Sequence, residues 1–246
     1  MVKYWEFKNI FSNEAELYIY GEIASFSWDD SSTSANMFKS ELDNIGEGTE
    51  LNIYLNSPGG EVFEGIAIGN MIKRRKGKTK CIVDALAASI ATVIAASCDE
   101  VVMYANSMMM VHNALTAVYG NSKDLIKMAE DLDRITESIK ETYLDKCKGK
   151  VSKDKFTELM DKETWLSAKE AYDLGLCDSI IEENRMVACA DPKVLKNYKN
   201  VPKKFKDSSF LNAQKPIKSK IAEEVKAMEG YENFGKNIYK SNQIFN

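Results

Sequence analysis

The 246-residue sequence has few of the residues that break a chain, cross-link it or bind a metal. It contains four prolines, one histidine and five cysteines. No two cysteines have the C-x-x-C spacing of a metal knuckle or a redox pair. A single histidine also excludes a histidine-based metal cluster. We therefore expect the cysteines to be small core hydrophobes, and we expect no metal and no cofactor.

Long apolar runs and an excess of positive charge are missing as well. No uninterrupted apolar stretch approaches the ~20 residues that span a bilayer. The first ten residues include Lys3, Glu6 and Lys8, unlike the apolar stretch of a signal peptide. The net charge of −4 disfavours a surface that neutralises phosphates. We therefore expect a cytoplasmic protein with neither a membrane nor a nucleic-acid partner.

Lysine and proline are concentrated at the C-terminal end. Residues 191–246 contain twelve lysines against six acidic residues, a net charge of +6, so the rest of the chain carries −10. Residues 193–220 have few apolar residues and no sustained period, and such a segment buries too little surface to offset its ordering entropy. A short helix at 221–228 is possible. We predict one domain over residues 1–184 and a flexible basic tail over residues 185–246.

Short apolar runs alternate with helical patterns through the predicted domain. Strands are expected at 15–20, 51–55, 80–84, 101–104 and 108–111, and helices at 31–45, 62–74, 89–98 and 122–148. This alternation predicts crossover units and a largely parallel sheet, hence an α/β fold. At ~1.5 Å per residue the last helix would reach ~38 Å, so we expect it to extend past its own core and pack on another surface.

A glycine-rich turn, Asn56-Ser57-Pro58-Gly59-Gly60, joins the second predicted strand to a helix. Two glycines leave backbone amides bare, and bare amides at a helix start bind a phosphate or the oxyanion of an acyl-transfer intermediate. The phosphate interpretation is disfavoured because the G-x-G-x-x-G spacing is absent and no Lys-Ser or Lys-Thr follows. A purely structural turn is the other interpretation.

Two further residues can carry chemistry. Ser89 lies in Ala-Ala-Ser-Ile-Ala, where a strand becomes a helix of small residues, a position that also suits a helix N-cap. His112 ends the apolar run Met-Met-Met-Val and can be a structural histidine. However, a serine hydroxyl is a weak nucleophile without a base of near-neutral pKa, and only His112 can supply that base.

Together these motifs resemble the Clp protease proteolytic subunit (ClpP-like) family of serine peptidases. The glycine turn, the Ala-Ala-Ser-Ile-Ala motif about thirty residues later and Met-Val-His-Asn about twenty-three further follow that family's order and spacing. The segment Trp-Leu-Ser-Ala-Lys-Glu-Ala at 165–171 resembles its closing segment. The resemblance covers about residues 15–182 and implies superhelical βαβ units of the ClpP/crotonase-like fold, with a long protruding handle helix.

The resemblance also implies roles for individual residues. By position, Ser89 would be the nucleophile and His112 the general base, while the backbone amides of Gly60 and Ile90 would form the oxyanion hole. The third catalytic residue would be Glu163, where the family usually has aspartate. Asp161, two residues earlier, is the alternative, because triads are defined by geometry and not by order.

The implied function is a serine endopeptidase that cleaves protein or peptide substrates through an acyl-enzyme intermediate. The opening residues 3–8 and the basic tail look most like the phage head maturation (prohead) branch, which implies a capsid or scaffold substrate in a phage-infected cell or prohead. Clp-type proteolysis fed by a AAA+ ATPase on a separate subunit is the other role. The family further implies a homo-oligomer, a heptameric ring or double ring. An inactive scaffold-binding protein and a crotonase-type acyl-CoA enzyme remain alternatives.

Overall fold

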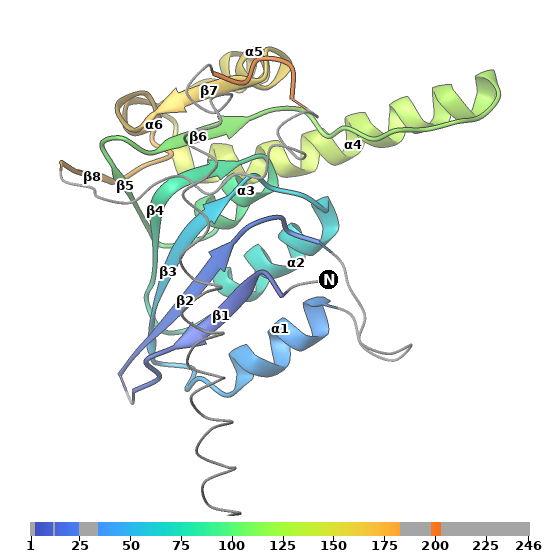
Figure 1. Ribbon diagram of the computed structural model, residues 1–246. Coiled ribbons are helices and arrows are strands. Elements are labelled where there is room, and N and C mark those ends of the chain that lie inside the picture. Colours follow the sequence, from blue (N-terminus) through green and yellow to red (C-terminus); the bar gives the residue numbers. More distant parts are fainter. Residues whose placement is uncertain (1–2, 12, 25–33, 183–197, 203–246) are drawn as a thin grey trace, which may run out of the picture.

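The computed structural model describes residues 3–11, 13–24, 34–182 and 198–202, which form a mixed α/β structure (Figure 1). The strands are β1 (Trp5–Lys8), β2 (Glu14–Tyr20), β3 (Glu50–Ser57), β4 (Thr79–Ala88), β5 (Glu100–Tyr104), β6 (Met108–Val111), β7 (Thr164–Ser167) and β8 (Ser179–Ile181). The helices are α1 (Ser34–Asp43), α2 (Val62–Lys73), α3 (Ile90–Ala96), α4 (Ser122–Cys147), α5 (Lys153–Asp161) and α6 (Ala168–Leu174).

Every described strand belongs to one sheet, in which β4 pairs with β3 along one edge and with β5 and then β6 along the other. The main order is β1-β2-β3-β4-β5-β8, parallel throughout except for the antiparallel β1. The first half of β4 pairs with β5 and its last three residues pair with β6, which continues antiparallel to β7. Ala88 lies opposite Met110 in that register, so the residues after β4 and β6 emerge side by side.

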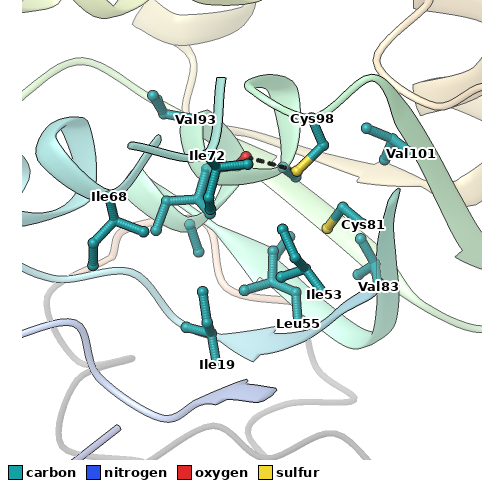
Figure 2. Close-up of a cluster of buried hydrophobic side chains, with 14 of the residues drawn as sticks. Ile19, Ile53, Leu55, Ile68, Ile72, Cys81, Val83, Val93, Cys98 and Val101 are labelled. Atoms are coloured by element: carbon teal, nitrogen blue, oxygen red, sulfur yellow. Dashed lines mark hydrogen bonds between the residues drawn. The ribbon is translucent and has the colours of Figure 1, made fainter. Parts of the chain in front are cut away.

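The core lies between this sheet and the helices α1, α2 and α3, which cover one of its faces (Figure 1). Alternate residues of each strand point to this face because side chains alternate along a strand. Ile19, Ile53 and Leu55 from the sheet meet Ile68 and Ile72 from α2 there, all fully buried (Figure 2). This part of the interior is therefore aliphatic, while Trp5, Phe38 and Phe156 add aromatic rings elsewhere in the same core.

The cysteines occupy the interior, as the sequence predicts. The four described cysteines are free and buried. Cys81 on β4 and Cys98 after α3 lie in the aliphatic core (Figure 2). Cys189 lies outside the described residues.

The long helix α4 starts inside a reciprocal capping box. The Asn121 side chain accepts hydrogen bonds from the amides of Lys123 and Asp124, and the Asp124 side chain accepts from the Asn121 amide. The buried residues of α4 lie between Thr136 and Cys147, whereas Leu125 and Ile126 are 45% and 62% exposed. The N-terminal half of α4 therefore projects from the body, as predicted (Figure 1).

The structure adds elements that the strand and helix patterns did not reveal. These are β1, α5, β7, α6 and β8, all of nine residues or fewer. The described part of the helix predicted at 31–45 is α1, and the helix predicted at 89–98 begins at Ile90. The strand expected at 80–84 is β4, which continues to Ala88. The other expected elements lie within a few residues of their predicted positions, and the α/β fold class is confirmed.

Most of the predicted basic tail lies outside the described residues, so the boundary after residue 184 stays a prediction. The described part of the tail, residues 198–202, packs on the domain, and Val201 is only 6% exposed against β4 and β6. Across all described residues, no helix combines the length and apolar character needed to cross a membrane.

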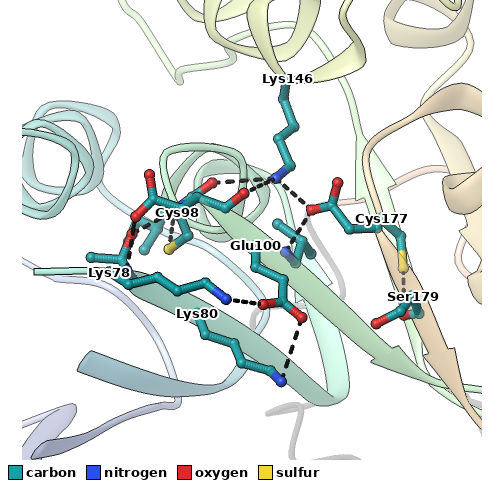
Figure 3. Close-up of polar contacts among 12 residues, drawn as sticks. Lys78, Lys80, Cys98, Glu100, Lys146, Cys177 and Ser179 are labelled. Carbon is teal, nitrogen blue, oxygen red and sulfur yellow. Dashed lines mark hydrogen bonds and ion pairs between the residues drawn. The ribbon is translucent and has the colours of Figure 1, made fainter. Parts of the chain in front are cut away.

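A buried lysine joins the end of α4 to the sheet. Lys146 forms an ion pair with Asp178 at 2.7 Å and donates to the carbonyl oxygens of Cys98 and Asp99 at 3.2 Å each (Figure 3). Asp178 also accepts from the amide of Val101 at 2.8 Å. The Lys146 side chain is 4% exposed, so its charge depends on these partners.

We expect Lys146→Ala to lower the free energy of unfolding by about 2–3 kcal/mol, because it leaves Asp178 and two carbonyl groups without their cation. Urea denaturation followed by circular dichroism measures the change. Lys153→Ala is the control, since Lys153 pairs with Glu137 and Glu141 at the surface, and it should leave the midpoint unchanged. Equal effects of the two substitutions would contradict a structural role for the buried pair.

Candidate active site

Ser89 occupies a strained turn between β4 and α3. Its backbone has φ 56° and ψ −129°, a combination that non-glycine residues rarely adopt. The turn is held by the Ser89 amide, which donates to the Met110 carbonyl at 2.9 Å. The side chain makes no capping hydrogen bond to α3, so the N-cap interpretation of its hydroxyl is wrong. A strained strand-to-helix turn is where hydrolases present a nucleophilic serine.

The Ser89 hydroxyl lies against the only histidine. His112 Nε2 and Ser89 Oγ are 2.7 Å apart, within hydrogen-bond distance. Burial lowers the pKa of His112 from its usual value, and the negative charge of Glu163 opposes that shift. The imidazole is 8% exposed and is kept neutral near pH 7, the form that accepts a proton from a serine.

The two candidate carboxylates have other partners. Glu163 accepts from the backbone amides of Lys199 at 2.9 Å and Asn200 at 2.7 Å. Asp161 accepts from the side chain of Asn113 at 2.8 Å. Within the described part of the chain, the His112 ring hydrogen-bonds only to Ser89. The hydrogen bond expected between Glu163 and His112 is therefore absent here, and so is one from Asp161.

The glycine turn packs directly against this pair. Gly59 and Gly60 have φ of +94° and +149°, and a Cβ atom on Gly59 would lie 2.6 Å from the Cβ of Ser89. A Cβ on Gly60 would lie 1.9 Å from the carbonyl oxygen of Ile23. Both positions therefore require glycine, which permits such conformations and such close approach.

A cavity of about 410 Å³ opens beside Ser89. Gly60, Ser89, Ile90 and His112 line one side. The lining also includes apolar residues of α4 and the preceding segment, namely Leu115, Met128, Leu132, Ile135 and Ile139. The predicted oxyanion-hole residues thus border the same cavity as the serine, while their role stays a prediction. The described residues include no cluster of three metal-ligating side chains.

Sequence reasoning missed one residue of the site, Tyr198. Its ring meets the His112 ring edge to face at 5.3 Å between centroids, and its hydroxyl donates to the Pro58 carbonyl at 2.8 Å. Burial raises the pKa of Tyr198 to about 12, so its hydroxyl is protonated at neutral pH. Tyr198 lies in the lysine-rich segment that we expect to be a tail, and no local pattern there indicates a contact with the domain.

Ser89 lies on a strained strand-to-helix turn and is hydrogen-bonded to a buried, neutral histidine beside a glycine turn. This is the arrangement of a serine hydrolase. The chain belongs to the Clp protease family, which matches residues 7–184. This assigns it to a family of peptidases and confirms the family resemblance.

Individual relatives agree with this assignment. The chain is 30% identical over 161 residues to the ATP-dependent Clp protease proteolytic subunit of Porphyromonas gingivalis, covering 62% of this chain and 70% of that one. It is 27% identical over 146 residues to the protein of the same name from Deinococcus radiodurans, covering 58% and 71%. Among solved structures, a ClpP1 mutant from Listeria monocytogenes superposes with a TM-score of 0.56 at 25% identity, covering 68% of this chain and 90% of that chain.

We expect Gly60→Ala to lower the free energy of unfolding by at least about 2 kcal/mol, since the new methyl group meets the Ile23 backbone and φ is unsuited to alanine. Thermal unfolding measured by circular dichroism tests this. Gly48→Ala is the control because a Cβ there has no neighbour within 4 Å, and it should stay within about 1 kcal/mol of the parent. A Gly60→Ala protein as stable as the control would show that the turn tolerates a side chain.

Proposed function

We propose that this protein is a serine endopeptidase that hydrolyses protein or peptide substrates through an acyl-enzyme intermediate. The observation that carries the proposal is the 2.7 Å contact between Ser89 Oγ and His112 Nε2 on the strained turn. Neither a structural N-cap nor a satisfied core histidine requires this contact. The adjoining cavity leaves room for a peptide next to the hydroxyl.

In this mechanism the neutral His112 accepts the Ser89 proton as the hydroxyl oxygen attacks the substrate carbonyl carbon. The tetrahedral intermediate carries a negative oxygen, which the amides of Gly60 and Ile90 stabilise. His112 then returns the proton to the leaving amine. Water, deprotonated by His112, hydrolyses the acyl-enzyme and restores the Ser89 hydroxyl.

We assign Glu163, in preference to Asp161, as the carboxylate that supports His112. The support is electrostatic: the charge of Glu163 raises the pKa of the imidazole, whereas Asp161 does not contribute to the shift of that pKa. A carboxylate that stabilises the imidazolium lowers the energy of each proton transfer. The extra methylene of glutamate relative to aspartate gives this side chain the reach to change partners.

Two biological roles are consistent with such a peptidase. The basic segment after residue 190 and the N-terminal residues 3–8 favour phage head maturation, with a capsid or scaffold protein as substrate. The relatives named as subunits of ATP-dependent Clp proteases favour a cytoplasmic subunit that works with a AAA+ ATPase. Of these we propose head maturation. Portal and major capsid genes beside this gene would support it, and a neighbouring unfoldase gene would contradict it.

The alternatives differ from this proposal in their need for the serine. A crotonase-type acyl-CoA enzyme uses paired amides without a Ser–His pair, and an inactive scaffold-binding protein needs neither residue. The contact between Ser89 and His112 favours the peptidase over both.

We expect a fluorophosphonate to label Ser89 and we expect Ser89→Ala to abolish labelling and to lower peptide hydrolysis by more than about 10³-fold. Mass spectrometry of the labelled protein and a fluorogenic peptide assay measure the two effects. Ser97→Ala, at the other end of α3, is the control and should react like the parent. Hydrolysis that persists in Ser89→Ala would assign the chemistry to another residue, and a parent that neither reacts nor hydrolyses would favour the alternatives.

We also propose a homo-oligomer, a heptameric ring or double ring. Exposed apolar side chains on α4 and the segment before it, including Leu115, Leu125 and Ile126, support a contact with another subunit, since isolated domains rarely gather such groups.

Light scattering at micromolar concentration should then give a mass several times the 27.7 kDa of one chain. Ile126→Glu should shift the mass toward the monomer, because it places a charge in the apolar contact. Lys127→Glu, on the neighbouring position, should not. A parent protein that is uniformly monomeric at this concentration would exclude the ring.

A further inference from the structure

Residues 198–202, here called the C-terminal strap, cross the candidate active site although they lie beyond the family match at 7–184. Tyr198 contacts two parts of the candidate active site. Its ring packs against His112, and its hydroxyl donates to the carbonyl of Pro58 in the glycine turn. Tyr198 also lines the cavity that contains Ser89. Tyr198 therefore takes up part of the space that a peptide would need beside the serine.

The strap is held by the carboxylate that we assign to His112. The two oxygens of Glu163 each accept one backbone N–H, from Lys199 at 2.9 Å and from Asn200 at 2.7 Å. Hydrogen bonds to a charged acceptor are about twice as strong as neutral ones. Asn200 adds a bond from its side chain to the Lys162 carbonyl at 3.0 Å. While these bonds persist, neither oxygen of Glu163 is directed to the imidazole.

An apolar anchor completes the attachment. Val201 is buried in a small hydrophobic cluster, separate from the main core, with Ala85, Leu86 and Ala88 of β4 and Met110 of β6. These strands end one residue before Ser89 and His112, so the anchor packs on the segments that position the reactive pair. Burial of a single valine helps to seat the segment, and the stabilisation is small enough for the segment to be released.

We propose that the strap is an autoinhibitory segment that covers the Ser89–His112 pair and holds Glu163 away from His112. Its release opens the cavity and frees Glu163 to accept a hydrogen bond from the second ring nitrogen. The catalytic consequence rests on the proposed peptidase function, whereas the competition between the strap and His112 for Glu163 does not. Lys199 and Asn200 hold Glu163 through backbone amides, which every polypeptide carries, so a protein substrate that presents backbone amides is the natural competitor.

The sole histidine gives a direct readout. In untagged full-length protein, His112 yields one imidazole signal, whose pKa nuclear magnetic resonance measures. Lys199→Pro removes one N–H that binds Glu163, while Lys199→Ala keeps it. We expect Lys199→Pro and Tyr198→Ala to raise the pKa of His112, because burial decreases and the carboxylate of Glu163 becomes available. Lys199→Ala should not change it. Glu163 and Tyr198 are the titratable groups next to the ring, and Tyr198 stays protonated in this range.

The fluorophosphonate reaction tests the catalytic consequence. We expect labelling of Ser89 about tenfold faster in Lys199→Pro and Tyr198→Ala than in the parent, the change produced by about 1.4 kcal/mol in the opening equilibrium. Tyr172→Ala, on α6, is the control and should label at the parent rate. An unchanged pKa of His112 in both strap variants, or slower labelling, would overturn the proposal. A raised pKa in proteins that never label would support the strap and reject the peptidase function.

Discussion

The candidate site depends on the double pairing of β4. One ten-residue strand pairs with β5 over its first half and with β6 at its end, and the amide of Ser89 extends that second ladder to the Met110 carbonyl. Because β6 runs parallel to β4 in this register, His112 emerges beside Ser89 although twenty-three residues separate them. A slip of one residue would turn every side chain of β6 to the opposite face and separate the pair.

Much of this arrangement could be predicted from local pattern. The apolar runs of β2 to β6 and the period of α4 predict their elements, and parallel strands bring their C-terminal ends to one edge. The short elements β1, α5, β7, α6 and β8 were not predicted, because they are too short to show a clear hydrophobic period. For α6 a signal existed: Ser167 and Glu170 form a capping box, the S-x-x-E pattern of a helix start. The partner of Glu163 had no such signal, since it is the backbone of Lys199 and Asn200, and any sequence supplies amides.

The surroundings of His112 combine opposing influences on one imidazole. Burial favours the neutral base and Glu163 favours the charged acid, and burial prevails in the structure as it stands. A general base works best when both forms are accessible near the working pH. While both Glu163 oxygens bind the strap, His112 favours its neutral form. Neutral His112 accepts a proton readily, but the imidazolium that results is only weakly stabilised by Glu163. In the proposed mechanism the strap would thus influence catalysis through the protonated form of His112 as well as through access to Ser89.

The backbone conformation of Ser89 lowers the stability of the fold. Glycine adopts the φ and ψ of Ser89 without steric strain, whereas any other residue here carries strain of about 1–3 kcal/mol. Glycine at this position would relax the turn and remove the hydroxyl in the same step. Descendants of this chain that no longer needed chemistry would therefore gain stability by losing the serine. A serine at such a position is what selection for reactivity, and not for stability alone, would retain.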